Sequence, residues 1–204
     1  MIKLYHAQYT RSLRVRWLME ELGIEYELSR VDFAKGDHKT DAFKQVNPFG
    51  TMPAFEDGDV KMFESGAVVT YLMDKYGDGG LRPEPGTPES AQYLAWFFYG
   101  EASLQPYFST LARHMIFLPK EQRVEQVASG ARQGALDDLK VLDGFLATRD
   151  YIAGDKFSAA DIMVTYSIVL GHLFGVLPNV GLPHVEAYYE RMAARDAFKT
   201  ATAD

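Results

Sequence analysis

The stretch from residue 47 to residue 72 constrains the fold of this chain more than any other. Two short apolar runs, residues 52–55 and 60–63, are separated by the dipeptide Asp57-Gly58. A two-residue hairpin turn needs positive φ, which glycine adopts without steric cost. The sequence therefore predicts a β-hairpin with Gly58 in its turn.

A proline opens the first strand of this hairpin. Pro53 cannot donate to a strand ladder, so it belongs at an edge, a first position or a special turn. If the Met52-Pro53 bond is cis, Met52 presents its N–H and C=O groups outward. A bound peptide can pair with these groups as a short added strand, so Met52 and Pro53 are candidate peptide-binding residues.

The start of a helix follows the hairpin. Ser65 precedes apolar residues at helical spacing, so it is a candidate N-cap. Free N–H groups at a helix start favour a carboxylate, and the neighbouring Glu64 carboxylate accepts bonds from an amine. Glu64 and Ser65 together are suited to an amino-acid head group, which carries both charges side by side.

The order of the predicted elements gives a first domain over residues 1–78. Residues 2–5 predict a strand, the spacing over residues 15–22 predicts a helix that ends at Gly23, and residues 26–33 predict a second strand. The hairpin and its helix complete the order β-α-β-α-β-β-α, in which a second helix is expected between the second strand and the hairpin. This order is typical of a thioredoxin-like α/β domain with a mixed four-stranded sheet.

A second, all-helical domain is predicted over residues 88–204. It follows a linker rich in glycine and proline at residues 77–89. Pro106 interrupts the first long helix and is expected to kink it. Ser158 and Asp161 have the S-x-x-D spacing of a capping box, so we interpret Asp161 as structural.

Composition excludes several kinds of site. The chain has 204 residues, no cysteine and a formal net charge of −7, which excludes disulfides, zinc–thiolate sites and a cysteine nucleophile and argues against a nucleic-acid partner. The histidines lack metal-ligand spacing, so no metal is expected. No segment is long and apolar enough to cross a membrane, and the first residues lack a signal-peptide core, so we expect a cytoplasmic protein without membrane association.

Several motifs resemble those of the cytosolic glutathione transferases, and the resemblance covers the whole chain. The family carries a cis-proline strand, a glycine-bearing hairpin, and then an acid or amide followed by Ser or Thr at a helix start. Residues 9–28 look like the family's first helix and following strand. The other matching motifs are GDHKTDAFKQVNPFGTMPAF and FYGEASLQPYF, which are similar to the theta-like bacterial and fungal branch, and FSAADIMV, which is similar to the second-domain capping box.

The resemblance implies a glutathione transferase that conjugates the thiolate of its co-substrate glutathione to small electrophiles in detoxification. It also implies a homodimer, and reduction of organic hydroperoxides as a second activity. A hydroxyl donor before the first helix stabilises the thiolate and lowers the pKa of the thiol. Thr10 occupies the position where the theta-like branch carries a serine. Ser12 is the alternative, and Tyr5 and Tyr9 stay open behind it.

The resemblance also assigns the binding residues. His38 matches a theta-like residue that contacts the glycine carboxylate of glutathione, and Lys39 adds a cation beside it. Glu64 and Ser65 are expected to hold the γ-glutamyl head.

Two questions remain open from the sequence. The electrophile is expected in the second domain, where the candidates are Tyr107, Phe108, Leu111, Phe117 and Phe174. The alternative function is a glutathione-binding or scaffold protein that has kept the fold and lost catalysis, and Thr10 in place of serine motivates this alternative.

Overall fold

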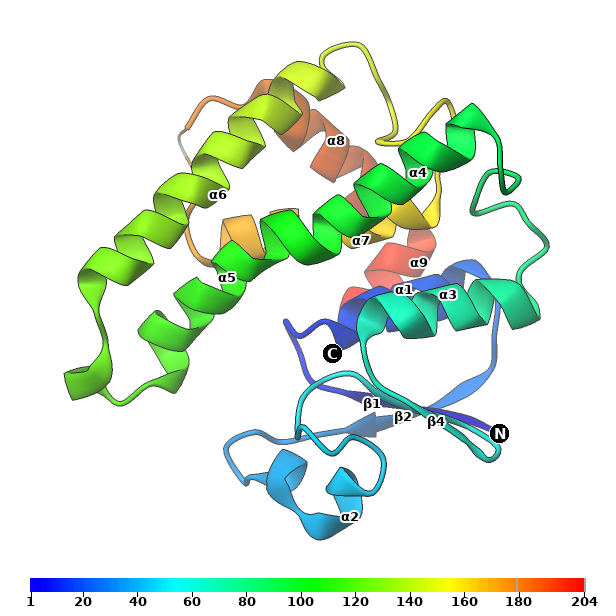
Figure 1. Cartoon of the computed structure of the whole chain (residues 1–204), viewed down its shortest axis with the longest axis vertical. Helices are drawn as coiled ribbons and strands as arrows, with labels where there is room; N and C mark the ends of the chain where they lie inside the picture. The colour runs from blue at the N-terminus through cyan, green and yellow to red at the C-terminus, as the bar shows by residue number, and fades with distance from the viewer. Residues whose placement is uncertain (179, 204) are drawn as a thin grey trace. The chain divides into compact units, whose positions relative to one another are not determined.

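The computed structural model describes residues 1–178 and 180–203, which form two compact units (Figure 1). The first unit comprises Met1–Leu81 and Ala193–Asp204, and the second comprises Arg82–Met192. No helix in the described part of the chain is long and apolar enough to cross a membrane. Assignment of residues 1–78 to glutathione binding and of residues 88–204 to electrophile binding stays a proposal.

A mixed four-stranded sheet forms the centre of the first unit. Its strand order is β2-β1-β3-β4. Strand β1 pairs in parallel with β2 and antiparallel with β3, which is in turn antiparallel to β4. The strands are β1 Ile2–His6, β2 Tyr26–Arg30, β3 Ala54–Asp57 and β4 Val60–Met62. The predicted thioredoxin-like fold is confirmed.

The hairpin turn differs by one residue from the prediction. Asp57 pairs with Val60, so the two-residue loop is Gly58–Asp59 rather than Asp57-Gly58. Gly58 has a φ of 59°, which is the positive value that the turn requires. Strand β3 begins at Ala54, directly after a Met52-Pro53 bond that is cis, as the resemblance to the family implied.

Helices cover both faces of this sheet (Figure 1). Helices α1 (Ser12–Glu21) and α3 (Ser65–Tyr76) pack against each other on one face. The short helix α2 (Asp41–Lys44) lies on the other, after a 3-10 turn, η1 (Asp37–Lys39). Alternate residues of β1, namely Ile2, Leu4 and His6, are buried, because successive side chains of a strand point to opposite faces.

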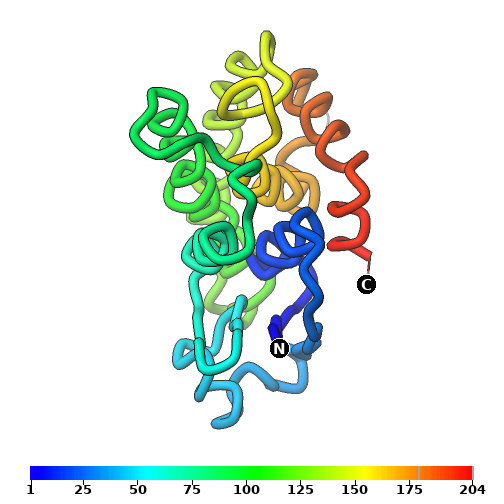
Figure 2. Tube along the Cα trace, turned by 90° about the vertical axis from the view of Figure 1, so that its right-hand side faces the viewer, coloured from blue at the N-terminus to red at the C-terminus, as the bar shows by residue number. Residues whose placement is uncertain are grey.

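The chain returns to the first unit in a helix that the sequence analysis did not separate from the rest. Helix α9 (Asp196–Thr202) packs against α1 (Figure 2). The Phe198 and Trp17 rings lie 4.8 Å apart, edge to face. Arg195 donates to both carboxylate oxygens of Glu21, at 2.6 and 2.7 Å. This bidentate geometry fixes the last helix to the first.

The second unit is helical throughout its regular part, as predicted. Helix α7 is its most buried helix, with 12 of its 15 residues in the core. Helix α4 and the π-helical turn η2 pack against α7. The elements are α4 Pro88–Phe98, η2 Tyr99–Leu104, α5 Gln105–Ala112, a second π-helical turn η3 Arg113–Phe117, a 3-10 turn η4 Lys120–Gln122, α6 Glu125–Leu146, α7 Ala159–Leu173 and α8 Pro183–Ala193.

The interruption predicted at Pro106 takes the form of the π-helical turn η2, which ends just before α5. Proline lacks the N–H that an α-helix needs at this point, and a π-turn is one way to change the hydrogen-bond register. A Cβ on Gly100, within this turn, would lie 2.8 Å from the carbonyl carbon of Met163. Glycine is therefore required where η2 approaches α7.

Candidate functional site

The strand register gathers the predicted site residues of the first unit at one end of its sheet. Tyr5, near the end of β1, lies opposite Ala54, the first residue of β3. Phe55 lies opposite Met62, the last residue of β4. The turn after β1, the loop before β3 and the start of α3 after β4 therefore meet at the same end of the sheet. These are the segments that carry Thr10, Met52-Pro53 and Glu64-Ser65.

A chain of short hydrogen bonds follows β1. The Thr10 hydroxyl donates to the carbonyl oxygen of Ala7 at 2.7 Å and lies 2.7 Å from the Ser12 hydroxyl. The Ser12 hydroxyl in turn lies 2.8 Å from Nδ1 of His6. Ser12 and His6 are buried, whereas Thr10 is half-buried. Of the two hydroxyls, only that of Thr10 belongs to a residue with solvent-accessible surface.

Ser12 does not cap the first helix. Helix α1 begins at Ser12 itself, Arg11 is in the N-cap position, and no side chain caps this helix start. The hydroxyl of Ser12 is directed instead to His6 and Thr10.

The two tyrosines kept as alternatives differ in their surroundings. Tyr5 is on the opposite face of the sheet from His6, because the two are consecutive in β1. Its ring packs edge to face on Phe43 of α2, 5.5 Å between centroids. Tyr9 is 48% exposed and has a φ of 59°. The geometry favours Thr10 over Tyr5, and Tyr9 stays an alternative donor in the same turn as Thr10.

The loop before β3 is held by a buried asparagine. The Asn47 side chain donates to the carbonyl oxygens of Thr51 and Pro53, at 2.7 and 3.1 Å. Met52 and Pro53 are buried. Met52 belongs to a small apolar cluster against which Ala7 packs, so this loop lies beside the turn that carries Thr10.

His38 and Lys39 lie beside the same loop. A Cβ on Gly50 would be 2.8 Å from the carbonyl oxygen of His38. The His38 ring stacks on Phe33, 4.3 Å between centroids. Partial burial, and then the charge of Lys39, lower the pKa of His38 from its ordinary value and so favour the neutral ring. Lys39 is exposed and is the cation of this pair.

The start of α3 carries an unusual backbone. Glu64 is in the N-cap position with a φ of 68°, and no side chain caps the helix. The side chain of Glu64 is exposed. Ser65 is therefore not the N-cap that the sequence predicted. It is the first helical residue, it is buried, and its hydroxyl accepts a bond of 3.2 Å from the buried Arg14 guanidinium of α1.

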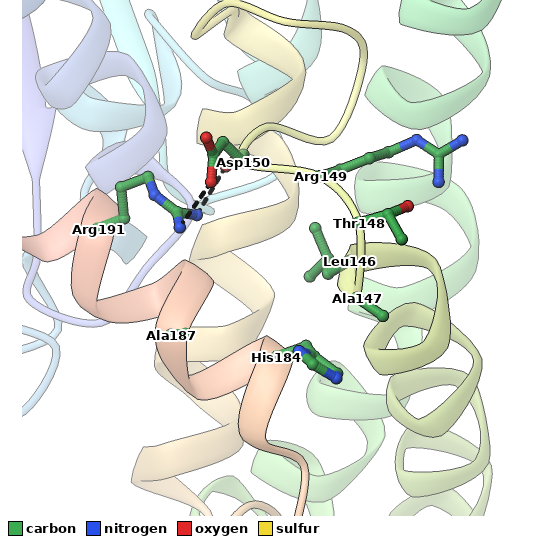
Figure 3. A pocket seen from close by; sticks show the side chains of 8 residues that line it. All are labelled: Leu146, Ala147, Thr148, Arg149, Asp150, His184, Ala187 and Arg191. Atoms are coloured by element: carbon green, nitrogen blue, oxygen red, sulfur yellow. Dashed lines mark hydrogen bonds and ion pairs between the residues drawn. The ribbon is translucent and has the colours of Figure 1, made fainter.

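A separate pocket lies in the second unit, between the end of α6 and α8 (Figure 3). Its volume is about 250 Å³ and its lining includes His184 and an ion pair of 2.8 Å between Asp150 and Arg191. None of the residues predicted to bind glutathione lines it. In the described residues, no group of three or more His, Asp or Glu side chains gathers as a metal site would require.

The candidate electrophile residues do not form one surface. Phe108 and Leu111 are fully buried and Phe174 nearly so, so they belong to the core of the second unit. Phe117 is 65% exposed.

Family models match both parts of this chain. The model described as the glutathione S-transferase N-terminal domain matches residues 1–74, and that of the C-terminal domain matches residues 95–196. The chain belongs to the glutathione S-transferase family. It is thus a transferase by family, and the resemblance drawn from its motifs is confirmed.

Relatives of this glutathione S-transferase cover it almost from end to end. Glutathione S-transferase 3 of Zea mays is 31% identical over 99% of this chain and 93% of its own length. The probable glutathione S-transferase GSTF1 of Oryza sativa is 32% identical over 95% of this chain and 91% of its own length.

Solved structures of this family share the fold, and two of them are described with glutathione bound. The glutathione transferase URE2P6 of Phanerochaete chrysosporium, in complex with oxidized glutathione, has a TM-score of 0.87 at 27% identity, covering 98% of this chain and 94% of its own. A family member from Pseudomonas fluorescens, with two glutathione bound, has a TM-score of 0.85 at 27% identity, covering 98% and 92%.

Sequence reasoning missed three residues that shape this site: His6, Arg14 and Asn47. His6 was considered only as a metal ligand. Its place in the alternation with Ile2 and Leu4 was the available signal that it is buried. No spacing rule indicates that Arg14 reaches Ser65, 51 residues away, because that contact exists only once α1 and α3 pack together.

Proposed function

We propose that this transferase binds glutathione at the end of its sheet and conjugates the glutathione thiolate to small electrophiles. The observation that carries the proposal is the start of α3. There an exposed acid, Glu64, stands at positive φ before a helix start that no side chain caps. A chain of this family with such an open helix start fits a ligand that has a carboxylate and an amine side by side.

The γ-glutamyl head of glutathione satisfies both groups at this helix start. Its carboxylate accepts from N–H groups of the first turn of α3, since the first four N–H groups of a helix lack partners within the helix. Its ammonium donates to the Glu64 carboxylate. The buried Ser65 hydroxyl stabilises this helix start, because it accepts a hydrogen bond from Arg14 that links α3 to α1.

The rest of the tripeptide extends along the loop before β3. Its backbone pairs with the main chain of Met52, next to Pro53. The glycine carboxylate lies toward His38 and Lys39, where the exposed ammonium of Lys39 supplies the charge and His38 supplies a hydrogen bond.

This placement brings the cysteine of glutathione to the turn after β1, where Thr10 stands. Its thiol has an ordinary pKa of about 8.5. A hydroxyl donated by Thr10, with Ser12 as the alternative, stabilises the thiolate and lowers this pKa. The thiolate attacks an electrophilic carbon, a carbon–sulfur bond forms, and the leaving group departs with the electron pair of the bond that breaks. Reduction of organic hydroperoxides is the proposed second activity: the same thiolate attacks the terminal oxygen, the O–O bond breaks and the alcohol leaves, and a second glutathione converts the resulting sulfenic acid to glutathione disulfide and water.

The decisive experiment pairs a glutathione titration by calorimetry with a conjugation assay on chlorodinitrobenzene. Binding together with conjugation supports the transferase. Binding without conjugation, over a set of electrophiles and hydroperoxides, would favour the non-catalytic scaffold instead. Absence of glutathione binding would overturn both.

A homodimer in the cytoplasm completes the proposal. The exposed Phe49 and Phe63 rings pack edge to face with their centroids 5.2 Å apart, and an exposed apolar pair of this kind favours burial against a partner surface. Sedimentation of the protein at micromolar concentration should give twice the mass of one chain. A Phe49→Ser variant should shift this equilibrium toward the monomer, and a monomeric wild type would contradict the dimer.

A further inference from the structure

The hydrogen-bond chain after β1 has a definite direction. It contains three short contacts: His6 Nδ1 to Ser12 Oγ at 2.8 Å, Ser12 Oγ to Thr10 Oγ1 at 2.7 Å, and Thr10 Oγ1 to Ala7 O at 2.7 Å. Each contact needs one proton between its two heavy atoms. The carbonyl oxygen of Ala7 can only accept, so the direction follows from that end of the chain.

Only one arrangement of protons satisfies all three contacts. Thr10 must donate to Ala7 O, so Thr10 Oγ1 must accept from Ser12. Ser12 has then used its proton, so it must accept from His6, and His6 must carry a proton on Nδ1. The remaining contact, from Ser12 to Ala7 O, is 3.5 Å long, and it cannot compete with bonds of 2.7 Å.

We propose that His6 is a positioning residue, whose Nδ1–H sets the direction of this chain and makes Thr10 the donor to the thiolate of bound glutathione. The proposal rests on the proposed function and deepens it. Ser12 cannot take that role while it donates to Thr10. Thr10 Oγ1 keeps its bond from Ser12 while rotation of its own hydroxyl proton transfers donation from Ala7 O to the sulfur. A hydroxyl that accepts one bond is a stronger donor in the next, because bonds in a chain polarise one another.

The first test is made on the unliganded wild-type protein and does not depend on any variant's activity. Nitrogen-15 NMR of the histidine rings reports which nitrogen carries hydrogen, and the signals of His6 are those absent from a His6→Asn spectrum. We expect a proton on Nδ1. A ring protonated on Nε2 alone would reverse the chain and overturn the proposal.

The second test measures the pKa of the thiol of bound glutathione by ultraviolet titration. We expect Thr10→Val to raise it by about one unit and His6→Leu by about half a unit, since His6 acts through two intervening bonds. His6→Asn keeps an amide donor near the place of Nδ1 and should restore most of the wild-type value. In a Thr10→Val background, His6→Leu should change nothing further.

The outcomes separate the positioning role from the proposed function. An unchanged pKa in a folded His6→Leu variant, or an additive rise in the double variant, overturns the role of His6 while glutathione binding stands. A wild-type protein whose bound thiol keeps its ordinary pKa overturns thiolate stabilisation itself. If His6→Leu does not fold, the NMR measurement on the wild type decides.

Discussion

The starts of helices α7 and α3 carry the same kinds of residue, an acid and a serine, with opposite results. At α7, Ser158 and Asp161 form a capping box in which each side chain bonds to the backbone of the other. Asp161 also accepts from the Ile152 N–H at 2.8 Å and the Tyr188 hydroxyl at 2.9 Å, and it is fully buried. The Ser158 and Asp161 side chains at this helix start are therefore satisfied by other groups of the chain.

The start of α3 has no such capping box. Glu64 is exposed, its backbone has positive φ, and no side chain caps the helix. A non-glycine residue held at such a φ costs about 1–3 kcal/mol, and such residues persist where the surrounding structure over-determines them, often at functional sites. The comparison teaches that the same residue types form a capping box at one helix start and none at the other, and the proposed ligand site is at the start without a box.

The largest expected effect is a loss of stability at the start of α7. Asp161→Ala should lower the free energy of unfolding by at least about 3 kcal/mol, because it leaves the buried Ile152 N–H, Ser158 N–H and Tyr188 hydroxyl without their acceptor. Urea denaturation measures this change. Glu190→Ala, which removes an exposed acid of α8, is the control and should stay within about 0.5 kcal/mol of wild type. A loss in Asp161→Ala no larger than in this control would break the comparison.

The next largest expected effect is a loss of glutathione affinity at the start of α3. Glu64→Ala should weaken glutathione binding about tenfold or more, because a hydrogen bond to a charged group contributes about 1.5–3 kcal/mol. Titration calorimetry measures the affinity, and Asp59→Ala in the exposed hairpin turn is the control. Unchanged affinity in Glu64→Ala would show that the γ-glutamyl head binds elsewhere.

A smaller effect is expected at Ser65, which belongs to both the fold and the site. Ser65→Ala removes the acceptor of a bond from the buried Arg14, so it should lower the free energy of unfolding by about 1–2 kcal/mol. Its glutathione affinity should fall less than that of Glu64→Ala. Ser129→Ala on the exposed face of α6 is the matched control. A Ser65→Ala protein of full stability that loses affinity more than Glu64→Ala would mean that the hydroxyl contacts the ligand directly.

The smallest expected effect is a difference in stability between two variants of Glu64, which distinguishes the role of its backbone from that of its side chain. Glu64→Gly and Glu64→Ala both lack the carboxylate, but only glycine adopts a φ of 68° without strain. The glycine variant should be more stable than the alanine variant by about 1 kcal/mol, with the same glutathione affinity. Equal stability would indicate that this backbone stores no strain.

Most of the fold was predictable because its signals are local. The glycine turn of the hairpin, the helix end at Gly23 and the capping box of α7 each depend on residues within a few positions of one another. The order of these elements was enough for the thioredoxin-like fold, because short connections leave few arrangements for that order. The separate helix α9 was missed, since the contacts that hold it, from Phe198 to Trp17 and from Arg195 to Glu21, cross most of the chain.

The sequence by itself determined the family, the two kinds of domain and the residues that meet at the end of the sheet. It did not determine which polar groups at that end of the sheet already have hydrogen-bond partners within the protein. Only the tertiary structure decided that Ser65 bonds to Arg14, that Glu64 is exposed at positive φ, and that His6 reaches Ser12. The physical reason is that a hydrogen bond depends on distances of a few tenths of an ångström, which packing fixes and residue spacing does not.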